Sequence, residues 1–414
     1  MIRIYREHPE FGEYTRFDSK QGDVSHLTAS EFKSVAELHP TFTGPSCPTH
    51  TNFPRRVYFQ ITRRCTLLCE YCFIKADASQ PSLDTKVILA IARHLGSRGL
   101  MEVRLTGGEP TLHIGFEEIC RCFQEQGVYV SVGTNGLWTR TVKSFLAEQE
   151  HLFLIVSIDG SEITHNYYRS NSYRQVVSNL LELRRANRHI RVRLNTVLTK
   201  RSRCDLRHLC ELAQRLGVYN ITLLPLRCQV RTTAVREDRL SPAEFKSAVE
   251  EMIRYKAEYG INFTTALGAR FKGEIMPDNV FARQSSCAAG REGTNLDFDS
   301  HRGKMLMYGC SYCSASDLRD DSPLRPILVA GEFPYEHPEE FDAIWSDSRR
   351  WRIFRDLDLK PRKCQACGEF RSSCTGACPI ETLGACTDLT RIDDLNASVA
   401  EQMLAGQEWY CYES

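Results

Sequence analysis

The 414-residue sequence has no long apolar run, no sign of an export signal and almost no net charge. No stretch approaches the ~20 apolar residues that a membrane-spanning helix needs. Residues 1–6, MIRIYR, contain no apolar signal core. Lysine and arginine exceed aspartate and glutamate by one, 53 against 52, which gives no support to nucleic acid or a membrane as the partner. We therefore expect a cytoplasmic protein without nucleic-acid or membrane partners.

Cysteine, in contrast, is abundant, with 18 residues. Because no export signal is visible, disulfides do not explain this number, and metal or cluster ligation becomes the leading explanation. Most of the cysteines fall in two groups, within residues 65–72 and 287–386. Four others occur in helical patterns and are interpreted as buried or partly buried free thiols: Cys120, Cys122, Cys204 and Cys210.

Strand and helix patterns alternate between residues 54 and 228. Several of the strands are almost entirely apolar, as burial on both faces of a parallel sheet requires. Six such units predict an α/β fold, a partial (β/α)6 barrel like a TIM barrel, and the composition after them changes to a C-terminal cysteine-rich extension. The predicted strands are 57–62, 103–106, 128–133, 152–159, 191–198 and 220–224. The predicted helices between them are 83–95, 116–126, 139–148, 173–186 and 205–216.

The pattern divides the chain into four predicted segments. A helix over 242–259 begins at Ser241-Pro242, with Glu244 nearby, and Thr28 precedes a shorter helical pattern. The N-terminal segment has two possible roles, to cover one end of the barrel or to hold a substrate. The segments are an N-terminal hairpin and helix (1–50), the partial barrel (51–235), bridging helices (236–285) and a cysteine-rich domain (286–414).

The first cysteine group, Cys65, Cys69 and Cys72, follows the predicted strand 57–62 with the spacing C-x3-C-x2-C. Three thiols are too few to fill a tetrahedral metal centre from this loop alone. The spacing suggests a cluster in which three irons bind thiolates and one iron stays open. The stretch CTLLCEYCF resembles the signature of the radical S-adenosylmethionine (SAM) enzymes. The resemblance implies that SAM binds the open iron and is cleaved by the reduced cluster to a 5′-deoxyadenosyl radical.

A glycine pair follows the second predicted strand in the stretch TGGEP, residues 106–110. The glycines let the backbone approach a ligand closely, and Glu109 can accept a hydrogen bond from an ammonium group. Alone this stretch would be a turn. In register with the cysteine loop, it resembles the family's element for the amino group of SAM. Gly107, Gly108 and Glu109 are therefore candidate SAM ligands.

Polar residues end the next strands. Thr134 and Asn135, within GTNG, resemble another common element of the family. Asp159, within SIDG beside Ser157, stands where the family often has a polar residue near the ribose of SAM. Asn195 is a further candidate for the ribose or the carboxylate. For Asp159 and Asn195 the alternative is a hydrogen bond at a turn or strand end. The backbone near Tyr71 and Leu224 is expected beside the adenine.

The second cysteine group contains C-x2-C-x6-C-x3-C-P over residues 364–379. It resembles the SPASM extension of radical SAM enzymes, which carries two auxiliary clusters. The resemblance implies three [4Fe–4S] clusters in all. The first auxiliary cluster would use Cys287, Cys310, Cys313 and Cys378. The second would use Cys364, Cys367, Cys374 and Cys386.

Two spacings depart from the SPASM pattern. Six residues separate Gly303 from Cys310, and six separate Cys367 from Cys374, where the family commonly has shorter gaps. Cys310 and Cys313 are therefore open to a second interpretation, one ligand and one spare thiol that leave an iron open. Cys411 is an alternative to Cys386. Structural zinc is the alternative for the whole group, because C-x2-C pairs are also typical of zinc sites.

The resemblance implies an oxidoreductase-type enzyme that abstracts hydrogen from a ribosomally made peptide and installs a crosslink, an oxidation or an epimerisation. Its partners would be a precursor peptide and a reductant such as flavodoxin or ferredoxin. One alternative is a dehydrogenase or epimerase of a sugar or antibiotic. Another is a non-catalytic electron-transfer protein, although electron transfer needs no SAM pocket. Cys228, just past the sixth strand, is a candidate hydrogen-atom donor, and an ordinary loop thiol is the alternative.

Overall fold

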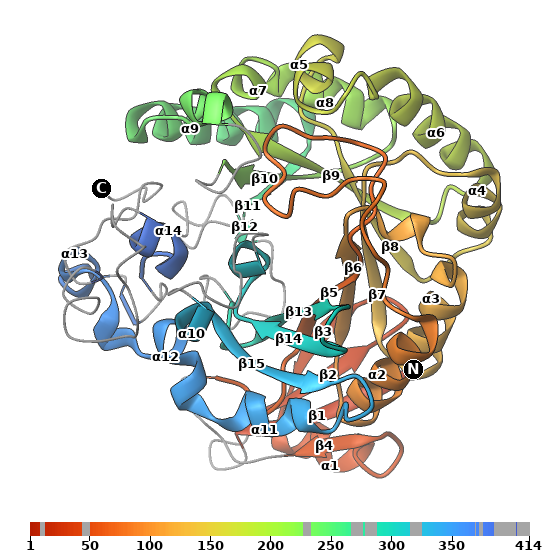
Figure 1. Ribbon diagram of the computed structural model, residues 1–414, viewed down its shortest axis with the longest axis vertical. Helices are drawn as coiled ribbons and strands as arrows, with labels where there is room; N and C mark the ends of the chain where they lie inside the picture. Colours follow the sequence, from red (N-terminus) through yellow and green to blue (C-terminus); the bar gives the residue numbers. More distant parts are fainter. Residues whose placement is uncertain are drawn as a thin grey trace.

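The computed structural model describes residues 1–8, 13–43, 50–226, 233–265, 276–277, 288–314, 325–368, 370–371, 376–384 and 403. The strands form two sheets, one of four strands and one of eleven (Figure 1). The larger sheet has the order β12-β11-β10-β9-β8-β7-β6-β5-β13-β14-β15. Helices form an outer arc around its parallel strands, which confirms the predicted α/β fold.

The six predicted parallel strands are all present, and neighbours along the chain are neighbours in the sheet. On β5 the side chains of Val57, Phe59 and Ile61 are fully buried, as a strand covered on both faces requires. These strands are β5 (Arg56–Thr62), β6 (Glu102–Gly107), β7 (Tyr129–Thr134), β8 (Leu152–Ser157), β9 (Arg191–Leu198) and β10 (Asn220–Pro225).

The six predicted long helices also form, and none of the described helices is both long and apolar enough to cross a membrane. Ser241 caps α9 through a capping box with Glu244, and Gly260 ends that helix in the left-handed conformation. Cys120, Cys122 and Cys210 are buried thiols as predicted, but Cys204 is exposed because it ends a short surface helix. The long helices are α2 (Thr85–Ser97), α3 (Phe116–Glu125), α4 (Arg140–Ala147), α6 (Tyr173–Ala186), α8 (Leu206–Arg215) and α9 (Pro242–Tyr259). Shorter elements between them are η2 (Pro110–Leu112), α5 (Glu162–Tyr168), α7 (Lys200–Cys204) and η3 (Thr233–Asp238).

The sheet extends beyond the six predicted strands at both ends. At one edge, β11 (Asn262–Thr265) pairs in parallel with β10, and β12 (Met276–Pro277) follows it. At the other edge, β13 (Gly293–Asp299) pairs in parallel with β5. The hairpin of β13 and β14 (Lys304–Tyr308), with β15 (Val329–Pro334), therefore continues the barrel sheet instead of forming a separate layer.

The C-terminal part also contacts the barrel through side chains. His94 of α2 and Arg98, directly after that helix, both bond Asp342 of α11 (Glu340–Ser346), at 2.9 and 2.6 Å. Trp345 and Trp351 are buried beside each other and bury the guanidinium of Arg355. The remaining short elements are η4 (Ser311–Ser314), α10 (Arg325–Leu328), η5 (Ser348–Trp351), α12 (Arg352–Arg355), η6 (Leu357–Leu359), α13 (Arg362–Gln365) and α14 (Pro379–Gly384).

The N-terminal residues form the four-stranded sheet, in the order β3-β2-β1-β4. Thr28 caps its helix through a capping box, as predicted. Tyr5 and Phe17 of this sheet pack against Met101 and Tyr129, which lie at the amino ends of β6 and β7. The elements are β1 (Ile2–His8), β2 (Glu13–Asp18), β3 (Asp23–Leu27), α1 (Ala29–Val35) and β4 (Thr41–Thr43).

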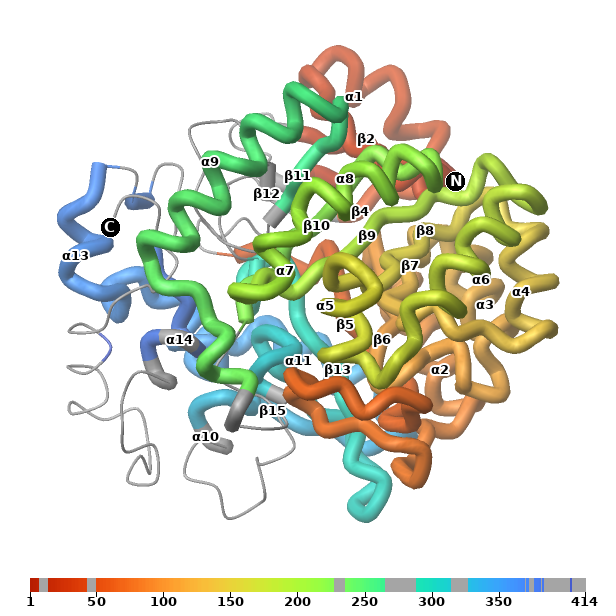
Figure 2. Tube along the Cα trace, turned by 90° about the horizontal axis from the view of Figure 1, so that it is seen from above, coloured from red at the N-terminus to blue at the C-terminus, as the bar shows by residue number. Residues whose placement is uncertain are grey.

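This sheet covers the amino ends of the parallel strands, whereas the cysteine loop follows the carboxyl end of β5. Figure 2 shows the two on opposite sides, the N-terminal segment in red and the loop after β5 in orange. Of the two roles considered for the N-terminal segment, the structure favours covering one end of the barrel.

We predict that Phe17→Ala lowers the free energy of unfolding by about 3–5 kcal/mol, because Phe17 is fully buried between the two sheets. Leu38→Ala is the matched control; this side chain is 74% exposed, and its loss should cost less than about 0.5 kcal/mol. Urea unfolding followed by circular dichroism measures both. Equal effects would mean that the N-terminal sheet is not part of the packed core.

Candidate active site

The loop after β5 carries Cys65, Cys69 and Cys72, and hydrogen-bond donors approach its sulfurs. Cys65 is buried, and its Sγ accepts from the backbone N–H of Leu67 at 3.4 Å and from Asn135 Nδ2 at 3.8 Å. Burial raises the pKa of the Cys65 thiol to about 12, so the free thiol keeps its proton. A metal ligand must lose that proton, and the two N–H donors favour the thiolate form.

The glycine pair is required by the approach of β6 to the cysteine loop. Gly107 has φ +140°, and a Cβ there would lie 2.0 Å from Thr62 O. A Cβ on Gly108 would lie 2.1 Å from Arg64 O. Two backbone bonds close this contact, Gly108 N–H to Thr62 O at 2.8 Å and Glu109 N–H to Arg64 O at 2.7 Å. The glycines therefore bring the backbone close to the loop that carries Cys65, and their contact with SAM stays a prediction.

Glu109 joins the end of β6 to the end of β7. Its buried Oε1 accepts from Thr111 Oγ1 at 2.7 Å and from Thr134 Oγ1 at 2.8 Å. Its Oε2 accepts from Asn135 N–H at 2.6 Å. Burial raises the pKa of Glu109, and these bonds oppose that shift. A carboxylate oxygen can accept about two hydrogen bonds. Oε2 accepts one from Asn135 and can accept a second from the amino group of SAM, as predicted.

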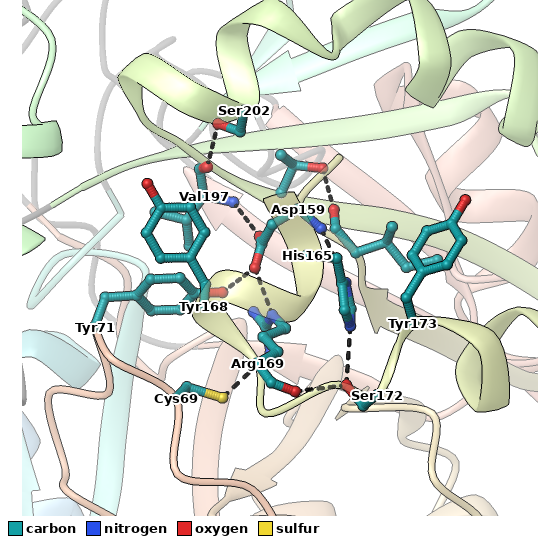
Figure 3. Close-up of polar contacts among 12 residues, drawn as sticks. Cys69, Tyr71, Asp159, His165, Tyr168, Arg169, Ser172, Tyr173, Val197 and Ser202 are labelled. Carbon is teal, nitrogen blue, oxygen red and sulfur yellow. Dashed lines mark hydrogen bonds and ion pairs between the residues drawn. The ribbon is translucent and has the colours of Figure 1, made fainter. Parts of the chain in front are cut away.

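Asp159 follows β8, is fully buried and also contacts the cysteine loop. Its Oδ1 accepts from Val197 N–H at 2.9 Å, and its Oδ2 accepts from the Tyr71 hydroxyl and from Arg169 Nε at 2.6 Å (Figure 3). Arg169 Nη1 also lies 3.9 Å from Cys69 Sγ. Arg169 thus brings three predicted residues together, Cys69, Tyr71 and Asp159, although the sequence analysis did not identify it.

A hydrogen-bonded chain fixes the backbone of Arg169. Asp159 N–H donates to His165 Nδ1 at 3.4 Å, so the ring proton lies on Nε2 and is donated to Ser172 Oγ at 2.9 Å. Ser172 Oγ in turn donates to Arg169 O at 2.8 Å (Figure 3). Burial lowers the pKa of His165 to about 4, which keeps the ring neutral near pH 7.

The turn after α5 binds the cysteine loop directly. Tyr168 O accepts from Glu70 N–H at 3.1 Å, and Ser170 Oγ accepts from Leu68 N–H at 3.3 Å. Ser170 and Asn171 both have positive φ, 52° and 54°, which turns the chain back toward α6. Residues 168–172, which we term the Arg169 turn, therefore hold the middle of the cysteine loop.

The remaining predicted SAM ligands lie near these two groups. Ser157 and Asn195 are partners in the register of β8 and β9. Asn195 Oδ1 is buried, and no described hydrogen-bond partner reaches it, as expected of an atom meant for a ligand. Tyr71 and Leu224 both pack against the apolar cluster formed by Tyr168, Val197, Leu226 and Val235. The two residues predicted beside adenine therefore share one apolar surface.

Two cysteines of the predicted first auxiliary site are close together, and a third acts on one of them through its charge. Cys310 Sγ and Cys313 Sγ are 3.9 Å apart, and Cys378 is near enough to Cys313 to act on its charge. Tyr312, between the first two, packs on Phe73 of the cysteine loop with ring centroids 4.8 Å apart. The other predicted ligands within the described residues are Cys364 and Cys367, joined by a backbone bond of 3.0 Å.

Several predicted residues lie outside the described part of the chain: Cys228, Cys287, Cys374, Cys386 and Cys411. Among the residues that are described, no three His, Cys, Asp or Glu side chains converge as they would around a single metal ion. Ligation by each cysteine therefore stays a proposal.

Residues 59–213 match the family model described as the radical SAM superfamily. This part of the chain is a radical SAM domain, as its cysteine loop predicted, and the cofactors of such a domain are SAM and one [4Fe–4S] cluster. The site fits that cluster. It offers three thiols on one loop, two N–H donors at Cys65 and a guanidinium at Cys69.

Two relatives resemble the chain over most of its length. The AdoMet-dependent heme synthase of Methanosarcina barkeri is 26% identical over 339 residues, 79% of this chain and 91% of the relative. The PqqA peptide cyclase of Methylorubrum extorquens is 24% identical over 348 residues, 81% and 82% of the two chains. The structure of Streptococcus suis SuiB bound to the precursor peptide SuiA has a TM-score of 0.68 at 15% identity, covering 95% and 97%. That likeness establishes a shared fold.

The sequence did hold one signal for the Arg169 turn. Ser161 and Glu162 begin a helical pattern directly after the fourth strand. Arg169 lies at the end of this pattern, a few residues before the predicted helix 173–186. Nothing in that pattern distinguishes a buried arginine from the exposed arginines around it. Its burial depends on Asp159 and Cys69, which are distant in the sequence.

We predict that Gly107→Ala destabilises the protein by more than about 3 kcal/mol, because the new Cβ meets backbone at a positive φ. Gly303→Ala is the control; Gly303 has φ +64°, but a Cβ added there would meet no atom within 4 Å, so about 1 kcal/mol is expected. Chemical unfolding measures both, and a Gly107 variant as stable as the Gly303 variant would contradict the close contact.

Proposed function

We propose that the protein is a radical SAM enzyme that abstracts a hydrogen atom from a ribosomally made peptide and thereby modifies it. The observation that carries this proposal is the arrangement around the cysteine loop. Asn135 contacts Cys65 of the loop and joins Glu109 and Thr134, and Asp159 contacts the loop through Tyr71. All of them lie at the carboxyl ends of neighbouring parallel strands, where barrel sites form.

Each residue has a definite task in this proposal. Cys65, Cys69 and Cys72 would each bind one iron of the cluster, and Asn135 would support the thiolate of Cys65. When bound, the cluster supplies the electron that cleaves SAM into methionine and a 5′-deoxyadenosyl radical. Glu109 Oε2 would accept a hydrogen bond from the amino group of SAM.

The nucleoside half of SAM is assigned to the other strands. Asn195 Oδ1 accepts from a SAM hydroxyl, and Ser157 and Asp159 border the ribose. Tyr71 and Leu224 pack on the adenine and keep water away from the radical. The remaining contacts are made by the backbone of Gly107 and Gly108.

The substrate class rests on the relatives. One is a peptide cyclase by name, and one solved neighbour was captured with a precursor peptide. The heme synthase makes a non-peptide product by name, so a small molecule is the second candidate. The N-terminal sheet adds no support for a peptide, because it lies at the far end of the strands.

The auxiliary clusters and the reductant are part of the same proposal. Cys310 and Cys313 lie together, and with Cys378 and Cys287 they make four ligands for one cluster. An oxidised product requires that an electron leaves the substrate, and an auxiliary cluster is a suitable acceptor. Flavodoxin or ferredoxin is the proposed electron donor. The second auxiliary cluster is assigned Cys364, Cys367, Cys374 and Cys386.

We predict that the reduced protein converts SAM to 5′-deoxyadenosine and that Cys69→Ala abolishes this conversion, because an iron of the cluster loses its ligand. Cys204→Ala is the matched control, since Cys204 is an exposed thiol. Chromatography of the quenched reaction measures the product. Cleavage that survives Cys69→Ala would rule out the assigned site. A neighbouring precursor peptide that keeps its mass while a small molecule is consumed would rule out the peptide substrate.

We also predict about twelve irons per chain, with a similar amount of acid-labile sulfide, in protein purified without oxygen, because three four-iron clusters are proposed. Elemental analysis measures iron and zinc together. About four irons with bound zinc would mean that the second cysteine group holds zinc instead.

A further inference from the structure

The Arg169 turn carries a buried cation next to a proposed cluster ligand. The Arg169 side chain is 11% exposed, and its Nε bonds Asp159 Oδ2 at 2.6 Å. Its Nη1 faces Cys69 Sγ at 3.9 Å, so one guanidinium bridges the carboxylate and the sulfur. A guanidinium keeps its charge under all ordinary conditions, and its planar fork suits such a bridge.

The contacts around Asp159 are suited to holding this cation. The carboxylate is fully buried and accepts from Val197 N–H, the Tyr71 hydroxyl and Arg169 Nε. Arg169 also lies over the Tyr71 ring, 5.2 Å from its centroid. The chain through His165 and Ser172 fixes its backbone carbonyl. The bond to Asp159, the contact with the Tyr71 ring and the bond at the backbone carbonyl together determine where the guanidinium points.

The guanidinium of Arg169 lies close enough to the proposed cluster ligand Cys69 to interact with the charge of the cluster. Reduction adds one negative charge to a cluster, and a fixed cation nearby stabilises the reduced form more than the oxidised one. Because Arg169 is largely buried, solvent ions screen this interaction less than they would at the surface. Asp159 offsets part of the charge, but its oxygen lies on the Nε side, away from the sulfur contact.

We propose that Arg169 is a positioning residue that holds Cys69 and raises the reduction potential of the SAM-binding cluster, with Asp159 as its anchor. The inference rests on the proposed function only in taking Cys69 as a cluster ligand. It gives Asp159 a task besides the predicted contact with the ribose, namely to aim the cation at the sulfur.

The test is a potentiometric titration of the full chain with its clusters, followed by electron paramagnetic resonance. The signal of the SAM-binding cluster is recognised by its change when SAM is added. Arg169→Gln should lower the midpoint potential, shifting the equilibrium between reduced and oxidised cluster at least about tenfold, which is about 59 mV for one electron. Arg174→Gln is the matched control, because it removes the same charge from a side chain that is 85% exposed. Its potential should stay that of the wild type.

Arg169→Lys keeps the charge without the planar fork and should shift the potential less than Arg169→Gln does. If Arg169→Gln does not retain iron, Arg169→Lys becomes the test. An Arg169→Lys protein with full iron content and a midpoint potential near that of the wild type supports the proposal. Loss of iron from both variants would overturn the electrostatic role.

A wild-type potential in Arg169→Gln with full iron content would also overturn the inference. This outcome is distinct from failure of the proposed function, in which the wild-type protein itself would not cleave SAM.

Discussion

The close backbone contact between the end of β6 and the loop after β5 determines the geometry of the site. Gly107 and Gly108 allow it, because a side chain at either position would overlap the carbonyl of Thr62 or Arg64. Two backbone bonds then fix the start of the cysteine loop relative to Glu109. The same contact therefore holds Cys65 and Glu109. It fixes the position of the proposed iron ligand, Cys65, relative to Glu109, the proposed acceptor for the amino group of SAM.

The cysteine loop is held at two places by groups of opposite charge. Glu109 and Asn135 contact its first half, where a carboxylate lies near the buried Cys65. The Arg169 turn contacts its second half and brings a cation to Cys69. Phe73 then continues the loop into contact with Tyr312, between two of the proposed auxiliary ligands. The loop therefore contacts the Glu109 side of the site, the Arg169 turn and the segment that carries Cys310 and Cys313.

The alternating strand and helix patterns predicted the fold well, because a parallel sheet needs apolar strands and amphipathic helices in strict order. The strands at both edges were missed. β11 is only four residues long. β13 pairs in parallel with β5, and no local sequence pattern reveals a pairing between strands so distant in the chain. In the site, motif spacing identified the cysteine loop and Glu109. Arg169 and His165 were missed because their roles depend on burial and on partners from other strands.

The central claim is that three cysteines leave one iron open for SAM, with Glu109 beside the amino group. Electron–nuclear double resonance of the reduced protein, with SAM carrying ¹⁵N at that amino group, tests it most directly. A resolved coupling between the cluster and the ¹⁵N nucleus is predicted, because the nitrogen would bind the open iron. SAM that binds at equilibrium without any ¹⁵N coupling would contradict the account.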